Sequence, residues 1–263
     1  MLEVPQYKRP PETIAIARGE FGTERARSVQ FGDRWFAFSC RRIHRGNTLR
    51  RRRALAFVAG IVAAASSFAS RPLTVDDAGT NATGEGHVEV WVERVNGTTS
   101  VVAAPAYAFA EGLELSAALA RETTHRLNGS VIQLKWLITP SKEDGCNVGT
   151  SFGGARTSGG GSSINASFLN GLLSCNGTAL GNVHLNLGTV KPSGQSGAGT
   201  WGIALEREFG AVTPHIEWFG AEGSKPTVQI GARTDIAKTI QLDGTVGRTD
   251  GNTQYSLGLK FKF

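Results

Sequence analysis

Hydrophobic and polar residues alternate along most of the chain after residue 85. The clearest case is segment 255–263, Tyr-Ser-Leu-Gly-Leu-Lys-Phe-Lys-Phe, where bulky apolar residues occupy every second position. A period of two places successive side chains on opposite faces of a β-strand, so one face is apolar and the other polar. The pattern predicts strands at residues 86–94, 98–109, 113–122, 130–139, 146–156, 163–174, 179–189, 200–208, 211–219, 226–233, 238–247 and 253–263.

Turn dipeptides separate many of these segments. Asn-Gly or Asp-Gly occurs at residues 96–97, 128–129, 144–145, 176–177 and 250–251. These residues tolerate the positive φ angles that tight hairpin turns require. The chain is therefore expected to form successive antiparallel hairpins.

An alternating strand can be covered by a second sheet, as in a β-sandwich, or by lipid, as in a transmembrane barrel. Segments of about ten residues suit tilted strands that cross a bilayer, and an even strand number keeps both ends on one side. Aromatic residues also gather at the predicted strand ends, with Phe109, Phe209, Phe261 and Phe263 at one end and Trp201, Trp218 and Tyr255 at the other. These features favour an all-β fold, a transmembrane antiparallel β-barrel of about 12 strands at residues 86–263, over the sandwich.

The polar phase of the strands predicts the lining of the lumen. Its expected members are Glu89, Glu114, Lys135, His184, Glu206, His215, Glu217, Arg233, Gln241 and Asp243. Mixed charges of this kind can orient a polar solute and tune selectivity. The same charges can instead pair with one another and fill a narrow interior. The pattern leaves an open and a plugged lumen as alternatives.

Two cysteines, Cys146 and Cys175, follow the N-terminal region, and the predicted topology places both at the periplasmic end of neighbouring strands. The periplasm is oxidising, so we predict a disulfide between them. The alternative is two separate thiols, because pairing depends on geometry.

The N-terminal region differs from the rest in charge. Residues 1–69 have a net charge of +8, whereas residues 70–263 have −2. Four arginines at 50–53, an apolar run at 54–65 and small residues at Ser67 and Ala69 indicate a secretory signal peptide at 49–69. An inner-membrane anchor is the alternative, but the apolar run is short for a span. Because the excess basic charge lies in a segment that export removes, we expect no nucleic-acid partner.

Two segments flank the signal peptide. Residues 1–48 are Arg-rich without clear periodicity and are expected to be a mis-annotated or disordered extension, with translation starting at Leu49 or Val29. Residues 70–85 are polar and Gly-rich and form a periplasmic N-terminal segment. This segment either tucks into the lumen as a plug or is a loosely ordered terminus, and the polar composition favours the loosely ordered terminus.

Several motifs resemble a known family. The segments are Arg71 to Thr80, then 231–235 with 240–247, and the ending Tyr255 to Phe263. They resemble the outer-membrane family of meta-pathway phenol-degradation and transporter proteins. That resemblance implies a β-barrel that moves small, often aromatic, molecules across the outer membrane.

The C-terminal strand carries a second resemblance. Tyr255, Leu257, Leu259, Phe261 and Phe263 are similar to the assembly signal that the barrel-assembly machinery recognises in bacterial outer-membrane proteins. We therefore expect this machinery and outer-membrane lipid as partners, besides a small-molecule solute.

The sequence favours passive passage or binding of small molecules. A non-conducting structural or interaction barrel is the first alternative, and a lipid-modifying enzyme that uses His184 is the second. The one G-x-S-x-G match, residues 149–153, lies within a predicted strand and not at the strand-to-helix turn of a nucleophile elbow, and the sequence shows no zinc or EF-hand spacing. We therefore expect no enzyme activity, catalytic residues, metal or cofactor.

Overall fold

The computed structural model describes residues 28–31, 34–37 and 73–263. The first two ranges form an antiparallel hairpin of β1 (Ser28–Phe31) and β2 (Arg34–Ala37), which belongs to a unit separate from residues 47–263. The predicted signal peptide at 49–69 lies outside the described residues, as does most of the predicted extension. Within the described part of the chain, no helix has the length and apolar character needed to cross a bilayer.

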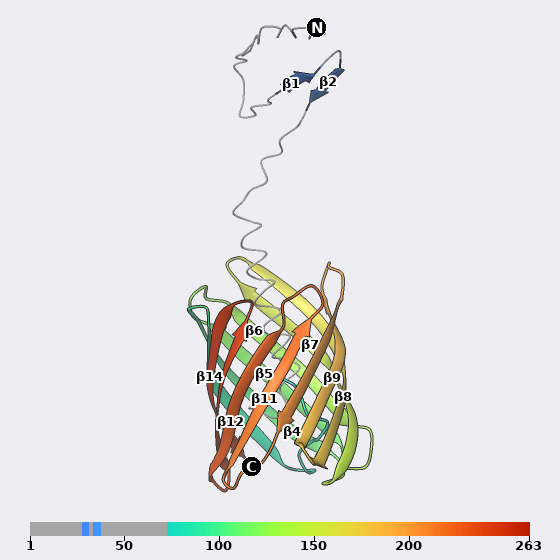
Figure 1. Cartoon of the computed structure of the whole chain (residues 1–263), viewed down its shortest axis with the longest axis vertical. Coiled ribbons are helices and arrows are strands. Elements are labelled where there is room, and N and C mark those ends of the chain that lie inside the picture. Colours follow the sequence, from blue (N-terminus) through green and yellow to red (C-terminus); the bar gives the residue numbers. More distant parts are fainter. Residues whose placement is uncertain (1–27, 32–33, 38–72) are drawn as a thin grey trace, which may run out of the picture. The chain divides into compact units, whose positions relative to one another are not determined.

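Residues 86–262 form a closed barrel of twelve antiparallel strands (Figure 1). The strands are β3 (Gly86–Val95), β4 (Thr98–Ala110), β5 (Leu113–Glu122), β6 (Asn128–Leu137), β7 (Gly145–Gly159), β8 (Ser162–Thr178), β9 (Gly181–Pro192), β10 (Ala198–Glu206), β11 (Val212–Ala221), β12 (Thr227–Ala237), β13 (Ile240–Thr249) and β14 (Asn252–Lys262). Each strand pairs with the next in sequence, and β14 pairs with β3. This closure confirms the predicted barrel, and the sandwich alternative is wrong.

The first and last residues of the barrel meet at one end. The Gly86 N–H donates to the Phe263 carbonyl at 2.8 Å, and the Phe263 N–H donates to the Gly86 carbonyl at 2.9 Å. We call this end the base and the opposite end the rim. The longest connection between barrel strands is residues 138–144, at the base.

Two predicted turns are confirmed and two are wrong, since Asn128-Gly129 lies at the start of β6. Asn96-Gly97 and Asp250-Gly251 form two-residue turns in which both residues have positive φ. Asn176-Gly177, in contrast, lies inside β8, next to a register shift between Cys175 and Thr178. Gly177 has a φ of 68°, which suits a β-bulge as well as a turn. The dipeptide therefore bends the strand, and the turn follows at residues 179–180.

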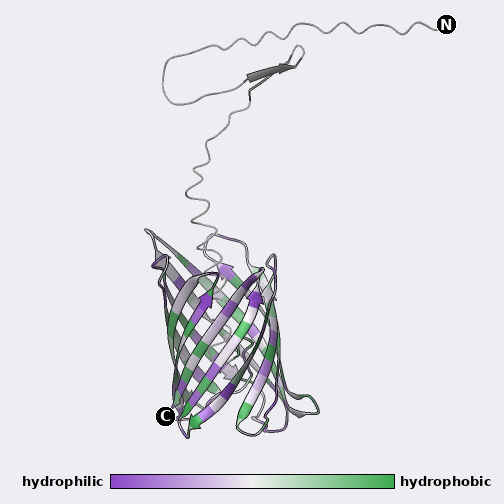
Figure 2. Ribbon diagram, turned by 60° about the vertical axis from the view of Figure 1, so that its left-hand side comes forward, coloured by the Kyte–Doolittle hydropathy of each residue, from purple (hydrophilic) through white to green (hydrophobic). Residues whose placement is uncertain are grey.

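The apolar face of each strand points outward. In β6, Ile132 and Trp136 are 58% and 48% exposed, whereas Gln133 and Lys135 between them are each 1% exposed. Figure 2 shows the same alternation of hydrophobic and hydrophilic residues along the barrel strands. The barrel is thus apolar outside and largely polar inside, the reverse of a water-soluble protein.

Candidate functional site

The structure brings the predicted lining residues into the barrel interior. Nine of the ten are buried: Glu89, Glu114, Lys135, His184, Glu206, His215, Glu217, Gln241 and Asp243. The tenth, Arg233 on β12, is half-buried and donates to the Glu206 carboxylate on β10. Their effect on solute passage stays a prediction.

A segment of the chain occupies the interior beside these residues. Residues 73–82, which we call the strap, precede β3, and Leu73, Val75, Asp76 and Ala78 in it are buried. The polar sequence favours a loosely ordered terminus here, and for residues 73–82 that prediction is wrong. A short polar segment carries no periodic pattern, so its order comes from the wall around it.

The wall holds the strap mainly by its main chain. The carboxylate of Glu217 on β11 accepts the N–H groups of Thr74 and Val75, at 2.5 and 2.7 Å. On β9, the Asn186 side chain accepts the Asp76 N–H and donates to the Asp76 carbonyl, both at 2.7 Å. These bonds pair main-chain groups that would otherwise be buried without partners.

The same pattern continues toward the base. The Ser174 hydroxyl on β8 accepts the Ala78 N–H at 2.8 Å. The Glu114 carboxylate on β5 accepts both the main-chain N–H and the side-chain amide of Asn81, at 2.9 and 2.7 Å. Glu114 and Ser174 lie near the base ends of their strands, whereas Gln229, whose amide donates to the Thr74 hydroxyl at 3.0 Å, lies near the rim end of β12. The strap therefore runs along the lumen toward the base.

Lys135 on β6 is the charged anchor of the strap. Its ammonium donates to the Asp76 carboxylate at 2.7 Å and to the carbonyls of Asp77 and Gly79 at 3.0 and 3.1 Å. Both Lys135 and Asp76 are almost completely buried. An ammonium has three donors, so these three acceptors satisfy it. The sequence predicts Lys135 as a lining residue, but no pattern identifies Asp76 as its partner.

Glycines in the wall make room for the strap. A Cβ on Gly202 of β10 would lie 2.8 Å from Cγ2 of Val75, and one on Gly149 of β7 would lie 3.5 Å from Cβ of Ala78. Leu73 and Val75 also form an apolar cluster with Ala204. The wall is therefore shaped to the strap.

A second polar cluster lies close to the strap. The Ser174 hydroxyl is 2.8 Å from Nδ1 of His184 on β9, and Nε2 of His184 is 3.7 Å from the Glu206 carboxylate. Elsewhere in the interior, Lys260 on β14 contacts Glu89 on β3 at 3.1 Å. The sequence analysis does not identify Ser174, because it shares the inward phase with many small polar residues.

The rim half of the interior is less polar on one side. Buried apolar side chains gather over β3 to β9, including Trp91 on β3 and Phe168 on β8. The sequence analysis predicts a polar lining and misses this apolar cluster, although both aromatic residues stand in the inward phase of their strands.

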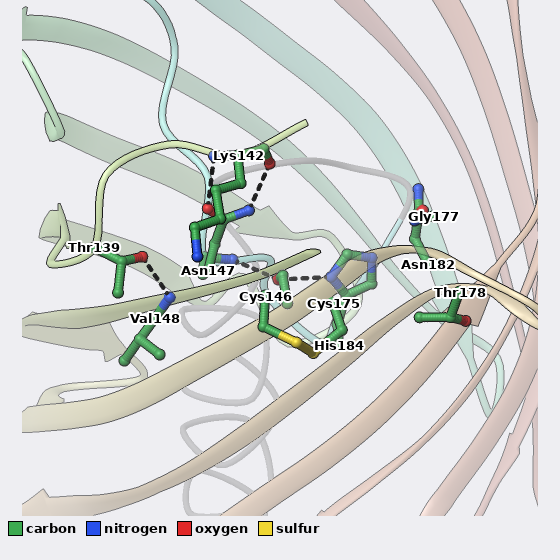
Figure 3. Close-up of a disulfide and its surroundings, with 12 residues drawn as sticks. Thr139, Lys142, Cys146, Asn147, Val148, Cys175, Gly177, Thr178, Asn182 and His184 are labelled. Atoms are coloured by element: carbon green, nitrogen blue, oxygen red, sulfur yellow. Dashed lines mark hydrogen bonds between the residues drawn. A yellow bond between two sulfur atoms is a disulfide. The ribbon is translucent and has the colours of Figure 1, made fainter. Parts of the chain in front are cut away.

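The predicted disulfide is present in the structure (Figure 3). Cys146 and Cys175 are register partners on β7 and β8, and they are joined by an S–S bond of 2.05 Å. Next to it, Asn147 exchanges two hydrogen bonds with the main chain of Lys142, both at 2.9 Å. The cross-link thus joins two strands at the base.

Residues of the predicted assembly signal lie on the outer surface of β14 and just after it. Tyr255, Leu257, Phe261 and Phe263 are exposed, and Leu259 between them is half-exposed. Recognition by the barrel-assembly machinery stays a prediction.

Solved structures of porins share the fold. A structure of KdgM porin in complex with disordered oligogalacturonate is 17% identical, covers 67% of this chain and 99% of that one, and has a TM-score of 0.56. A second KdgM porin structure is 15% identical over the same shares, with a TM-score of 0.52. Omp33 of Acinetobacter baumannii is 9% identical over 68% of this chain and 98% of its own, with a TM-score of 0.46.

Sequence comparisons place the chain more narrowly. No curated protein sequence matches it. A family profile described as "Uncharacterised conserved protein UCP029691" matches residues 56–256, which include every barrel strand except the end of β14. The chain belongs to this family.

Proposed function

We propose that this protein is an outer-membrane barrel that passes or binds small molecules through its lumen. The observation that carries the proposal is the inverted polarity of a closed barrel. Leu119, Leu187 and Leu257 are 67%, 73% and 62% exposed, while Lys135, Glu114 and Glu217 are buried inside. Lipid tails suit the outer surface, and charged linings of this kind contact solutes in membrane barrels.

Export and localisation are part of the same proposal. The signal peptide at 49–69 and the C-terminal strand both fit secretion to the bacterial outer membrane, with the base on the periplasmic side. The fold shared with KdgM porin supports this assignment. A disulfide at the base also suits an oxidising compartment.

The polar and apolar residues that line the lumen indicate the class of solute. The structure of KdgM porin in complex with disordered oligogalacturonate, together with the buried charges of this lumen, supports a polar solute here. The apolar cluster with Trp91 and Phe168 favours a solute that also has an apolar part. Transport of aromatic molecules, as the meta-pathway family resemblance implies, is the finer form of this hypothesis.

The strap affects whether a solute can cross the lumen. Because residues 73–82 run along the lumen, we expect that a solute that crosses needs the strap to move. We therefore expect planar-bilayer recordings of the exported chain to show brief openings, and deletion of residues 73–82 to lengthen them. A strap-deleted barrel that migrates as a folded, heat-modifiable band but gives neither channel events nor liposome swelling contradicts passage. That result favours a non-conducting structural barrel.

A second candidate function, hydrolysis of lipids, is favoured by the Ser174–His184 contact beside Glu206. Two features weaken it, since the Ser174 hydroxyl also accepts the Ala78 N–H and Glu206 is bonded to Arg233. Lipase activity that is present in the purified barrel and lost in Ser174→Ala supports this function. Equal activity in both proteins refutes it.

A further inference from the structure

The wall of the lumen binds the main chain of the strap, which bends at Thr74, Val75 and Ala78. Eight main-chain groups of the strap bond to wall side chains: the N–H groups of Thr74, Val75, Asp76, Ala78 and Asn81, and the carbonyls of Asp76, Asp77 and Gly79. The partners come from β5, β6, β8, β9 and β11, so they surround the strap. Main-chain groups are the same in nearly every residue, and another peptide can make these bonds.

The wall bonds to a bent main chain, in which the Asp77 carboxylate also accepts the Gly79 N–H at 2.6 Å. Asn186 exchanges two hydrogen bonds with Asp76, as an opposite residue does in an antiparallel pair. Glu217 takes two successive N–H groups with one charged carboxylate, and such charge-assisted bonds are about twice as strong as neutral ones. The wall therefore satisfies, with side chains, main-chain groups that the bent strap buries.

Three strap positions add side-chain selectivity. Val75 fits against Gly202, where no Cβ is tolerated without a shift. Asp76 pairs with the buried ammonium of Lys135. Ala78 lies against Gly149, which leaves room for a small residue. The preferred ligand therefore has an apolar residue, then an aspartate, and then a small residue two positions after the aspartate.

The strap is attached to the barrel in a way that allows exchange. It joins β3 through residues 82–85, which are exposed and include Gly84 with a φ of 88°. Within the described strap, its bonds to the wall are all non-covalent. We propose that the part of the lumen that holds the strap is a peptide-binding site, that the strap is its tethered occupant, and that short peptides of this pattern displace it. This rests on the proposed function for access to the lumen, but binding can be measured without conduction.

The test uses the folded chain with a nicked strap. A site-specific protease sequence inserted between Thr83 and Gly84 is cut after the barrel has folded, which turns the strap into an exchangeable peptide. The probe is a synthetic peptide of residues 73–82 with a fluorophore at its C-terminal end, because Ala82 is exposed. Fluorescence anisotropy then reports binding and competition.

We expect saturable binding of the probe, competed by unlabelled peptide of the same sequence. A peptide with Asp76→Ala should bind about 100-fold more weakly, because a buried ammonium loses its partner. Changing the peptide leaves the barrel unaltered, so misfolding cannot explain the loss. In the barrel, Lys135→Met should weaken binding similarly. Lys225→Met, which removes a solvent-exposed lysine at the rim, should leave binding unchanged.

Equal binding of the probe and of a scrambled peptide overturns the proposal, as does no binding to a barrel whose nicked strap has been washed out. The outcome is separable from the proposed function. A strap-free barrel that conducts but binds no peptide defeats the peptide site alone. A barrel that binds the peptide selectively but never conducts defeats passage alone.

Discussion

A designed disulfide can lock the strap to the wall. A Cβ placed on Gly149 lies 3.5 Å from Cβ of Ala78, within the range of about 3.5–4.5 Å found across disulfides. The variant Ala78→Cys/Gly149→Cys should therefore form a cross-link inside the lumen. The new Cβ would also lie 3.0 Å from the Trp136 carbonyl, so the wall must shift by a few tenths of an ångström.

The cross-link should lower the fraction of barrels whose strap is undocked. When the strap undocks from a folded barrel, only residues 79–85 between position 78 and β3 are free, and closing a loop of that length is worth roughly 2 kcal/mol. This corresponds to about a 30-fold decrease in the fraction of barrels whose strap is undocked. We expect the oxidised variant to show almost no openings in planar bilayers and the reduced variant to regain them.

Three controls isolate the lock. Mass spectrometry of tryptic peptides verifies the new cross-link. The wild type in the same reductant shows the effect of opening the native Cys146–Cys175 bond. The double variant Ala78→Ser/Gly149→Ser has similar size without a thiol. If the oxidised, cross-linked barrel conducts as well as the reduced one, then passage does not require strap movement, and the reasoning about the strap is refuted.

Three further predictions concern the wall, the cross-link and the lipid face. Gly202→Val should push the strap out of its place, since even a Cβ at that position comes 2.8 Å from Val75, and limited proteolysis of the strap should become faster than in the wild type. Cys146→Ser should lower the free energy of unfolding in urea by about 2–4 kcal/mol, and a change below about 0.5 kcal/mol would show that the paired strands already supply the constraint. Leu257→Arg should cost about 2–4 kcal/mol in lipid vesicles because the side chain faces outward near mid-strand, whereas Ser256→Arg, which faces inward, should not show this lipid-dependent cost.

Most of the barrel follows from local sequence. Hydrophobic and polar residues alternate within the strands, and Asn-Gly or Asp-Gly marks turns such as 96–97 and 250–251. A strand also needs no distant residue to define its inward phase, which is why Lys135 and Glu217 are assigned to the interior correctly. The disulfide follows from the same topology, because it places Cys146 and Cys175 on neighbouring strands.

The strap does not follow from local sequence, because its stability depends on contacts made across the barrel. Asp76 is 59 positions from Lys135 and 110 positions from Asn186 in the chain. Nothing within residues 73–82 indicates that these partners converge on it. The Asn176-Gly177 error has a related cause, since a positive φ is shared by turns and bulges and only strand pairing distinguishes them.

The interior charges give a physical reason for the strap to stay docked when no ligand is present. Lys135 is buried in the wall, and an ammonium without partners at such a place carries a large desolvation cost. The strap removes that cost with one carboxylate and two carbonyls. Any state in which the strap has left must satisfy Lys135 in another way, by water or by an anionic group of the incoming molecule. A solute with a carboxylate therefore stabilises the open state more than a neutral one of equal size. Comparing the open times in the presence of an acidic peptide and of its amidated, neutral counterpart measures that difference directly, and equal open times would show that Lys135 does not select the solute.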